Sequence, residues 1–92
     1  MKTIWKYQLE LNDKQFLNLP KGAEILAVQN QKETVCIWAM VNSEVLETEE
    51  RCFEIFGTGH EIPCDMGIDR KYIGTFQMEN GLLVFHLFER IN

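Results

Sequence analysis

Apolar and polar side chains alternate along much of this chain, and that pattern decides its secondary structure. In the clearest case, residues 5–11, every second residue is apolar and polar residues fill the positions between them. Successive side chains of an extended strand point to opposite faces, so this alternation predicts a strand with one buried face. The apolar set of this first strand is Trp5, Tyr7, Leu9 and Leu11.

Short extended segments of this kind recur between turn-forming residues. Pro20 and Gly22 predict one turn, and Asn80-Gly81 suits the positive φ of a tight hairpin turn. Residues 42–50 and 61–70 are expected to be loops. We predict an all-β, mainly antiparallel fold, a small barrel or sandwich of six to seven short strands. The further strands are expected at residues 16–19, 24–29, 34–41, 51–56, 72–78 and 82–89.

Two of these segments, 24–29 and 34–41, are apolar almost throughout and are joined by the polar link 30–33. This arrangement predicts an antiparallel hairpin. Continuous apolarity indicates burial on both faces, either at the centre of the fold or against another subunit.

Length and charge exclude several classes of protein. A chain of 92 residues supports one core, so we expect a single domain spanning residues 1–92. A net charge of −5 argues against binding to duplex nucleic acid, which needs an extensive basic surface. The first residues do not resemble a signal peptide, and the longest apolar stretch, Leu82 to Phe88, is interrupted by His86 and is too short to span a membrane. Three cysteines at wide spacing do not indicate a disulfide framework. We therefore expect a soluble, cytoplasmic protein.

The segment Gly57-Thr58-Gly59-His60 is the strongest candidate for a binding motif. Glycines allow backbone N–H groups to converge on an anion, and threonine and histidine add donors beside them. The segment lacks the lysine of a phosphate-binding P-loop and the third glycine of a dinucleotide fingerprint. An equally weighted interpretation is a tight turn at the end of a strand.

Soft metal ligands are present but widely spaced. Cys36, Cys52, His60 and Cys64 could be imagined around zinc, yet only His60 and Cys64 are close in sequence. We therefore predict no metal site and no cofactor, and we interpret the cysteines as free thiols. His86 alternates with apolar neighbours on one strand and ranks second to His60 as a functional histidine. No residue pattern indicates an activated nucleophile, so we expect no enzyme.

Aromatic and basic residues could together hold a nucleotide. Trp38 or Phe76 could pack against a base while Arg51, Arg70 or Lys71 meets its phosphate. The simpler interpretation is that aromatic residues at alternate positions fill the core.

Six segments spread over nearly the whole chain carry a family resemblance. They are Ile4-Trp5-Lys6-Tyr7, Leu19-Pro20-Lys21-Gly22-Ala23, Ile37-Trp38-Ala39, Phe56-Gly57-Thr58-Gly59-His60, Tyr72-Ile73-Gly74-Thr75-Phe76 and Val84-Phe85-His86-Leu87-Phe88-Glu89. In these segments the chain resembles a family of small uncharacterised bacteriophage and prophage proteins. The resemblance implies an origin in a phage or prophage, and therefore action in the cytoplasm of a bacterial host.

Two functional hypotheses follow by analogy with other small phage proteins. In the first, a homo-oligomer acts as a non-catalytic sponge that sequesters a phosphate-bearing, nucleotide-derived immune signal. Its predicted ligand-binding residues are Gly57, Thr58, Gly59, His60, Arg51, Trp38, Arg70 and Phe76. In the second, the domain binds and inhibits a host or defence protein through the acidic residues Glu44, Glu47, Glu49 and Glu50.

Overall fold

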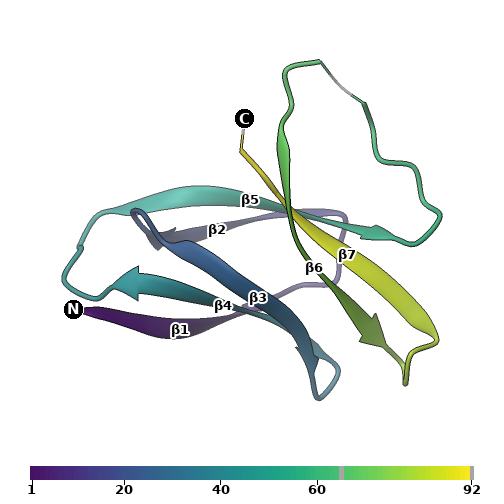
Figure 1. Cartoon of the computed structure of the whole chain (residues 1–92), viewed down its shortest axis with the longest axis horizontal. Helices are drawn as coiled ribbons and strands as arrows, with labels where there is room; N and C mark the ends of the chain where they lie inside the picture. Colours follow the sequence, from purple (N-terminus) through teal and green to yellow (C-terminus); the bar gives the residue numbers. More distant parts are fainter. Residues whose placement is uncertain (65, 92) are drawn as a thin grey trace.

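The fold is all-β. A computed structural model describes residues 1–64 and 66–91, and its regular structure there consists of seven strands (Figure 1). Every strand pair is antiparallel. The strands are β1 (Lys2–Leu9), β2 (Lys14–Pro20), β3 (Glu24–Gln31), β4 (Thr34–Asn42), β5 (Thr48–Gly57), β6 (Arg70–Met78) and β7 (Leu83–Arg90).

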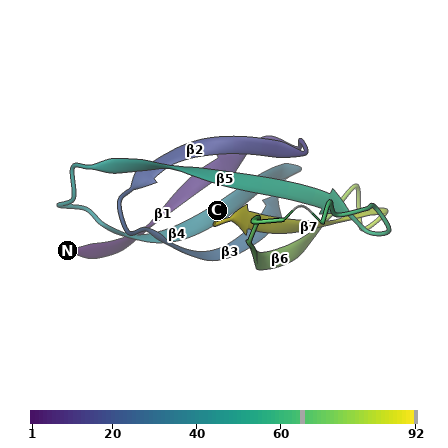
Figure 2. The same cartoon turned by 90° about the horizontal axis from the view of Figure 1, so that it is seen from above.

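The strands form two sheets that pack as a sandwich. One sheet has the order β1-β4-β3 and the other the order β2-β5-β7-β6. Viewed from above, β2 and β5 lie over β1 and β4, while the twist of the larger sheet brings β6 down beside β3 (Figure 2). The prediction of an all-β antiparallel fold is confirmed, and of its two architectures the sandwich is the one found.

The core lies between the sheets and follows the period-two pattern. Phe53 and Leu87 from the larger sheet and Ile37 from the smaller one are fully buried. The hairpin predicted from segments 24–29 and 34–41 is formed by β3 and β4, and β4 is the central strand of its sheet. The near-continuous apolarity of β4 therefore reflects a central position in the fold.

The seam between the sheets is closed where β3 meets β6. A Cβ atom at Gly74 would lie 2.8 Å from Cγ1 of Val28, so the absence of a side chain permits this close approach. Asn30 Nδ2 donates a hydrogen bond of 2.8 Å to the carbonyl of Gln77 across the same seam. Backbone proximity and side-chain hydrogen bonds therefore join the two sheets along this edge.

Two hairpin turns differ in how far the sequence predicts them. The β6–β7 turn places Glu79, Asn80 and Gly81 at φ values of 51°, 57° and 87°, as the Asn-Gly pair predicts. The β3–β4 turn is tighter than the expected link at 30–33. It consists of Lys32 and Glu33 at φ values of 52° and 62°, a conformation that neither residue favours.

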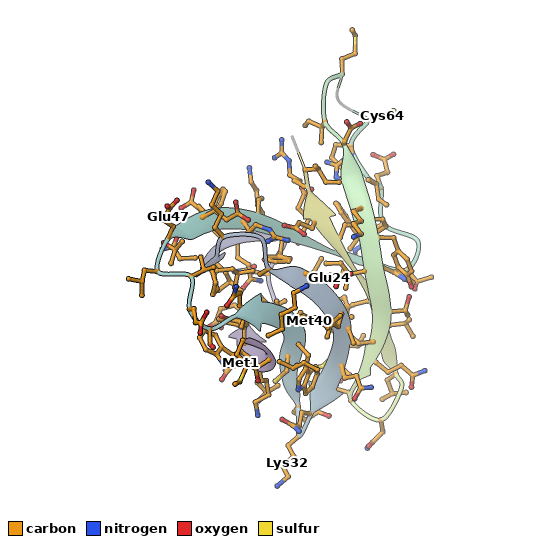
Figure 3. The ribbon with its side chains drawn as sticks, turned by 60° about the vertical axis from the view of Figure 1, so that its left-hand side comes forward. Met1, Glu24, Lys32, Met40, Glu47 and Cys64 are labelled. Atoms are coloured by element: carbon orange, nitrogen blue, oxygen red, sulfur yellow. The ribbon has the colours of Figure 1, made fainter. Side chains whose placement is uncertain are left out.

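The boundaries of the middle segment also differ from expectation. Residues 48–50 were expected in a loop, but β5 begins at Thr48 because β2 pairs with it as far as Pro20. Phe53 and Ile55 are buried on one side of β5 and Phe56 lies on the other, as alternation along a strand requires. Residues 58–64 and 66–69 contain no strand, and Cys64 lies in this long loop (Figure 3). Within the described residues there is no helix long and apolar enough to cross a membrane.

Candidate functional site

Three aromatic rings gather on the outer surface of the four-stranded sheet. Phe56 of β5, Phe88 of β7 and Tyr72 of β6 point away from the core, and we call them the aromatic face. The centroid of the Phe88 ring lies 5.8 Å from that of Phe56 and 5.4 Å from that of Tyr72, in edge-to-face geometry. Tyr72 is 54% exposed. Core packing does not account for this cluster, because it lies on the side of the sheet opposite the core.

Cationic side chains border the aromatic face. Arg70 Nε donates to Glu54 Oε1 at 2.8 Å, and its guanidinium lies 5.7 Å from the centroid of the Phe56 ring. Arg90 Nε lies 4.0 Å from the same carboxylate oxygen. One carboxylate thus faces two guanidinium groups. Lys14, across from Glu54 on β2, adds a third positive charge, and Glu50 adds a second negative one.

These side chains give the outer surface of the four-stranded sheet a positive net charge, opposite in sign to the net charge of the whole protein. Three cationic strand residues face two carboxylates there, whereas the chain carries a net charge of −5. Cys52 lies among these charges, and burial raises the pKa of its thiol. The surface is therefore suited to an anion that also presents a flat apolar group.

A chain of hydroxyl groups and one imidazole crosses the same surface. Thr58 Oγ1 lies 2.8 Å from His86 Nε2, and Thr75 Oγ1 lies 2.9 Å from His86 Nδ1. The Tyr72 hydroxyl is 2.5 Å from Thr75 Oγ1. Both ring nitrogens of His86 are therefore held by threonine hydroxyls.

This chain ends at the backbone of β7. Thr58 Oγ1 lies 3.4 Å from the carbonyl of Val84, which can only accept. The His86 ring thereby joins the hydroxyls of Thr58, Thr75 and Tyr72 in one continuous hydrogen-bonded chain. Its two ring nitrogens contact hydroxyls and not a carboxylate, which a catalytic imidazole would use to stabilise its protonated form.

The Gly57–His60 segment is a tight turn at the end of β5. His60 N–H donates to the Gly57 carbonyl at 3.0 Å, Thr58 N–H donates to the Val84 carbonyl at 3.1 Å, and Gly59 has a φ of 87°. The His60 ring covers Gly57, where an added Cβ would lie 2.8 Å from it. Two amides that an anion nest would need already donate to carbonyls. Of this turn, Thr58 is the residue that extends toward the aromatic face.

Arg51 occupies a different environment from the other candidate residues. Its Nε and NH2 groups contact both carboxylate oxygens of Glu89, and NH1 donates to the Ala23 carbonyl at 2.8 Å. NH1 also lies 3.3 Å from Glu49 Oε1. The hydrogen bond to Glu89 raises the pKa of Arg51 above its ordinary value. These contacts use Arg51 to close one end of the sandwich.

The two predicted stacking residues lie away from the aromatic face. Trp38 is half-buried on β4, in the other sheet. Phe76 is 4% exposed and packs against Phe85 in the core, with ring centroids 5.7 Å apart. The structure thus brings Thr58 and Arg70 to one surface and places Arg51, Trp38 and Phe76 elsewhere. Among the described residues, no three His, Cys, Asp or Glu side chains are grouped as metal ligands.

The sequence contains a signal for the aromatic face that residue-by-residue inspection misses. Glu54 alternates with Phe56, and His86 with Phe88, so each pair shares one strand face. Regular alternation would place Tyr72 on the same face as the buried Phe76, and the β-bulge between Tyr72 and Gly74 is what turns Tyr72 outward, opposite Phe88. Combining the faces of β5 and β7 would have paired Phe56 with Phe88, but it requires knowing that these strands are neighbours, and the bulge that adds Tyr72 has no signal in the alternation.

The fold and this surface define a small antiparallel β-sandwich with an outward-pointing aromatic face bordered by cations. The chain belongs to the family described as a domain of unknown function, DUF7352, which matches residues 1–92. No curated protein matches the chain. No solved structure matches it either.

Proposed function

We propose that this protein is a non-catalytic binding protein that holds a phosphate-bearing, nucleotide-derived ligand on the aromatic face. The observation that carries the proposal is the outward-facing cluster of exposed Tyr72 with half-buried Phe88 and Phe56, beside cations on an otherwise acidic chain. Aromatic rings offer stacking to any base, and arginine matches the geometry of phosphate oxygens.

The hydrogen-bonded chain through His86 supports binding in preference to catalysis. The His86 ring, whose two nitrogens engage Thr58 and Thr75, orients hydroxyl groups at the surface. The oxygens of such hydroxyls keep lone pairs that can accept hydrogen bonds from ribose hydroxyls without any bond being broken. Thr58 also ties the Gly57–His60 turn to this surface, so the turn forms one border of the proposed site.

The biological part of the proposal is sequestration. Encoded by a phage or prophage and acting in the bacterial cytoplasm, a homo-oligomer of this protein would withdraw a nucleotide signal from host immunity. Binding without turnover fits that role, since a sponge needs affinity and copy number and not chemistry.

The alternative, an inhibitor that docks on a host or defence protein through its acidic residues, has weaker support. Lys21 lies 3.6 Å from Glu47, and the N-terminal ammonium lies 3.5 Å from Glu44. Glu49 contacts Arg51. Three of the four carboxylates thus have cationic partners within the chain, which reduces the charge they can present to another protein.

The first test is binding of a panel of mono- and dinucleotides by calorimetry. We expect binding that weakens about 5- to 150-fold in Tyr72→Ala, the range given by about 1–3 kcal/mol per stacked base. The matched control is Ile4→Ala, because Ile4 is also 54% exposed but lies in the other sheet. Equal nucleotide affinity in the two variants would show that the ligand does not bind on the aromatic face.

The second test addresses the turn and the native ligand. The double variant Thr58→Val with His60→Ala should bind nucleotide more weakly if the turn borders the site. Unchanged nucleotide affinity would show that the Gly57–His60 turn is not part of the site. Heating protein recovered from phage-infected cells should release an intact nucleotide in near-stoichiometric amount. Recovery of a host polypeptide and no nucleotide would favour the inhibitor instead.

A further inference from the structure

A groove runs along the seam between β3 and β6, next to the aromatic face. Its volume is about 460 Å³, within the range of about 300–1,000 Å³ usual for small-molecule sites. Thr75 lines the groove and also contacts the Tyr72 hydroxyl, so the groove and the aromatic face adjoin. Most of its polar lining consists of carboxamides, namely Gln29, Asn30, Gln77 and Asn80.

The charge of the groove differs from that of the aromatic face. Among its described lining residues the one ionisable side chain is the carboxylate of Glu33, and no cation is present. A phosphate is therefore disfavoured here. A neutral group with several N–H donors is favoured, because carboxylate and amide oxygens accept hydrogen bonds.

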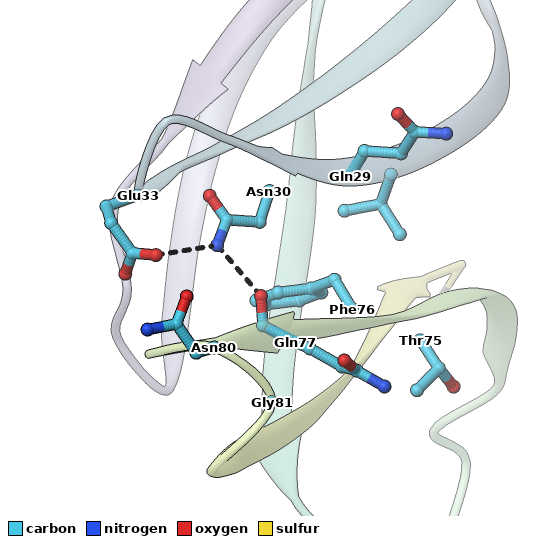
Figure 4. Close-up of a pocket in the computed structure, with 9 residues that line it drawn as sticks. Gln29, Asn30, Glu33, Thr75, Phe76, Gln77, Asn80 and Gly81 are labelled. Atoms are coloured by element: carbon cyan, nitrogen blue, oxygen red, sulfur yellow. Dashed lines mark hydrogen bonds between the residues drawn. The ribbon is translucent and has the colours of Figure 1, made fainter.

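The polar groups at one end of the groove are held in place. Asn30 Nδ2 donates to the Gln77 carbonyl at 2.8 Å and to Glu33 Oε1 at 3.3 Å, and Glu33 Oε2 accepts from the Glu79 N–H at 3.3 Å. Figure 4 shows Asn30, Glu33 and Asn80 directed toward one another at this end. These bonds fix the Glu33 carboxylate across the tips of two hairpins before any ligand arrives.

One acceptor beside Glu33 is left without a partner. Asn30 Oδ1 is buried and has no hydrogen-bond partner within the described residues. A buried acceptor without a partner costs free energy that a suitable donor would recover. This end of the groove thus presents the Glu33 carboxylate next to the side-chain amides of Asn30 and Asn80.

We propose that this groove binds a guanine base of the ligand, an inference that rests on the proposed nucleotide-binding function. Guanine presents two adjacent N–H donors, which one carboxylate can accept together, beside a carbonyl acceptor that an Asn or Gln amide can satisfy. Adenine and cytosine each present a single amino group and lack this pair of donors. Because the aromatic face is a separate surface, the ligand has two bases, one in the groove and one on the rings.

The test compares two phosphorylated dinucleotides, pApG and pApA, by calorimetry. The wild-type chain should bind pApG about 5- to 150-fold more tightly, as a good bidentate pair discriminates by about 1–3 kcal/mol. Glu33→Gln should abolish the preference, because the carboxamide offers one acceptor and one donor in place of two acceptors. Glu79→Gln is the control, since its side chain is in the adjoining turn and does not line the groove.

The outcomes separate this inference from the proposed function. A guanine preference lost in Glu33→Gln and kept in Glu79→Gln supports it, and equal affinity for both dinucleotides in the wild type overturns it while leaving the aromatic face as the site. If neither dinucleotide binds, the proposed function fails as well. Thermal unfolding of each variant shows whether the fold is intact, and Asn80→Ala provides a second substitution expected to weaken pApG more than pApA.

Discussion

At the scale of single residues, the least favourable backbone conformation lies at the tip of the β3–β4 hairpin. Lys32 and Glu33 both have positive φ, and neither is a glycine or asparagine. Sequence reasoning places a looser link at residues 30–33, because nothing in Lys-Glu indicates a two-residue turn. Pairing of β3 with β4 up to Gln31 and Thr34 imposes the tight geometry instead.

Replacing one of these residues should stabilise the protein. We expect Lys32→Asn to raise the free energy of unfolding by about 0.5–1 kcal/mol, since asparagine tolerates the left-handed conformation. Urea unfolding followed by tryptophan fluorescence measures the change. Gln31→Asn, inside β3, should give no gain, and equal stabilisation by both substitutions would contradict the explanation.

The three thiols should differ in reactivity according to their surroundings. Cys64 is exposed, Cys52 is half-buried with a pKa that burial raises, and Cys36 is 3% exposed. The thiolate is the reactive form, so a raised pKa moves reaction to higher pH. At pH 8 a disulfide reagent should label Cys64 first, Cys52 more slowly and Cys36 after unfolding. As a control, Cys64→Ser should lose the fastest labelling phase. A fast phase that survives in this variant would contradict the predicted order of thiol reactivity.

At the scale of structural elements, alternation predicts strand faces well and strand partners poorly. The inward positions of β5 and the Asn80-Gly81 hairpin follow from local sequence, because side-chain period and turn chemistry are local properties. The pairing of β5 with both β2 and β7 joins residues far apart in the chain. That pairing brings Phe56 beside Phe88, and the β-bulge between Tyr72 and Gly74 turns Tyr72 to the same surface, so alternation alone identifies neither Phe88 nor Tyr72 as part of the aromatic face.

The contact between β5 and β7 at the sandwich end should contribute measurably to stability. Arg51 and Glu89 form a two-point ion pair with side chains only 17% and 10% exposed. Removing one partner leaves the other charge partly buried, so we expect Glu89→Gln to cost about 2–4 kcal/mol in urea unfolding. Glu47→Gln removes the exposed pair with Lys21 and should cost less than about 0.5 kcal/mol. Similar losses of unfolding free energy in the two variants would show that the Arg51–Glu89 pair does not stabilise the fold.

At the scale of the whole molecule, the sandwich is thin and broad. Its extents are 40 × 36 × 16 Å and its radius of gyration is 13.7 Å, against about 12 Å expected for a compact chain of this length. β1 and β2 are edge strands, and each has a single hydrogen-bonded neighbour. Trp5, on the core side of β1, is nevertheless 42% exposed. An inward-facing tryptophan that one chain does not cover is the feature that a second copy would bury.

The proposed homo-oligomer can be tested through that tryptophan. Light scattering after size-exclusion should give a mass that is a multiple of 10.8 kDa, and Trp5→Glu should shift it to the monomer because a carboxylate at the edge opposes burial. Leu46→Glu, at a loop position that is 93% exposed, should leave the mass unchanged. A wild-type mass of one chain at tens of micromolar would exclude the oligomer. The aromatic face and the groove both lie within one chain, so ligand binding would then have to persist in the monomer.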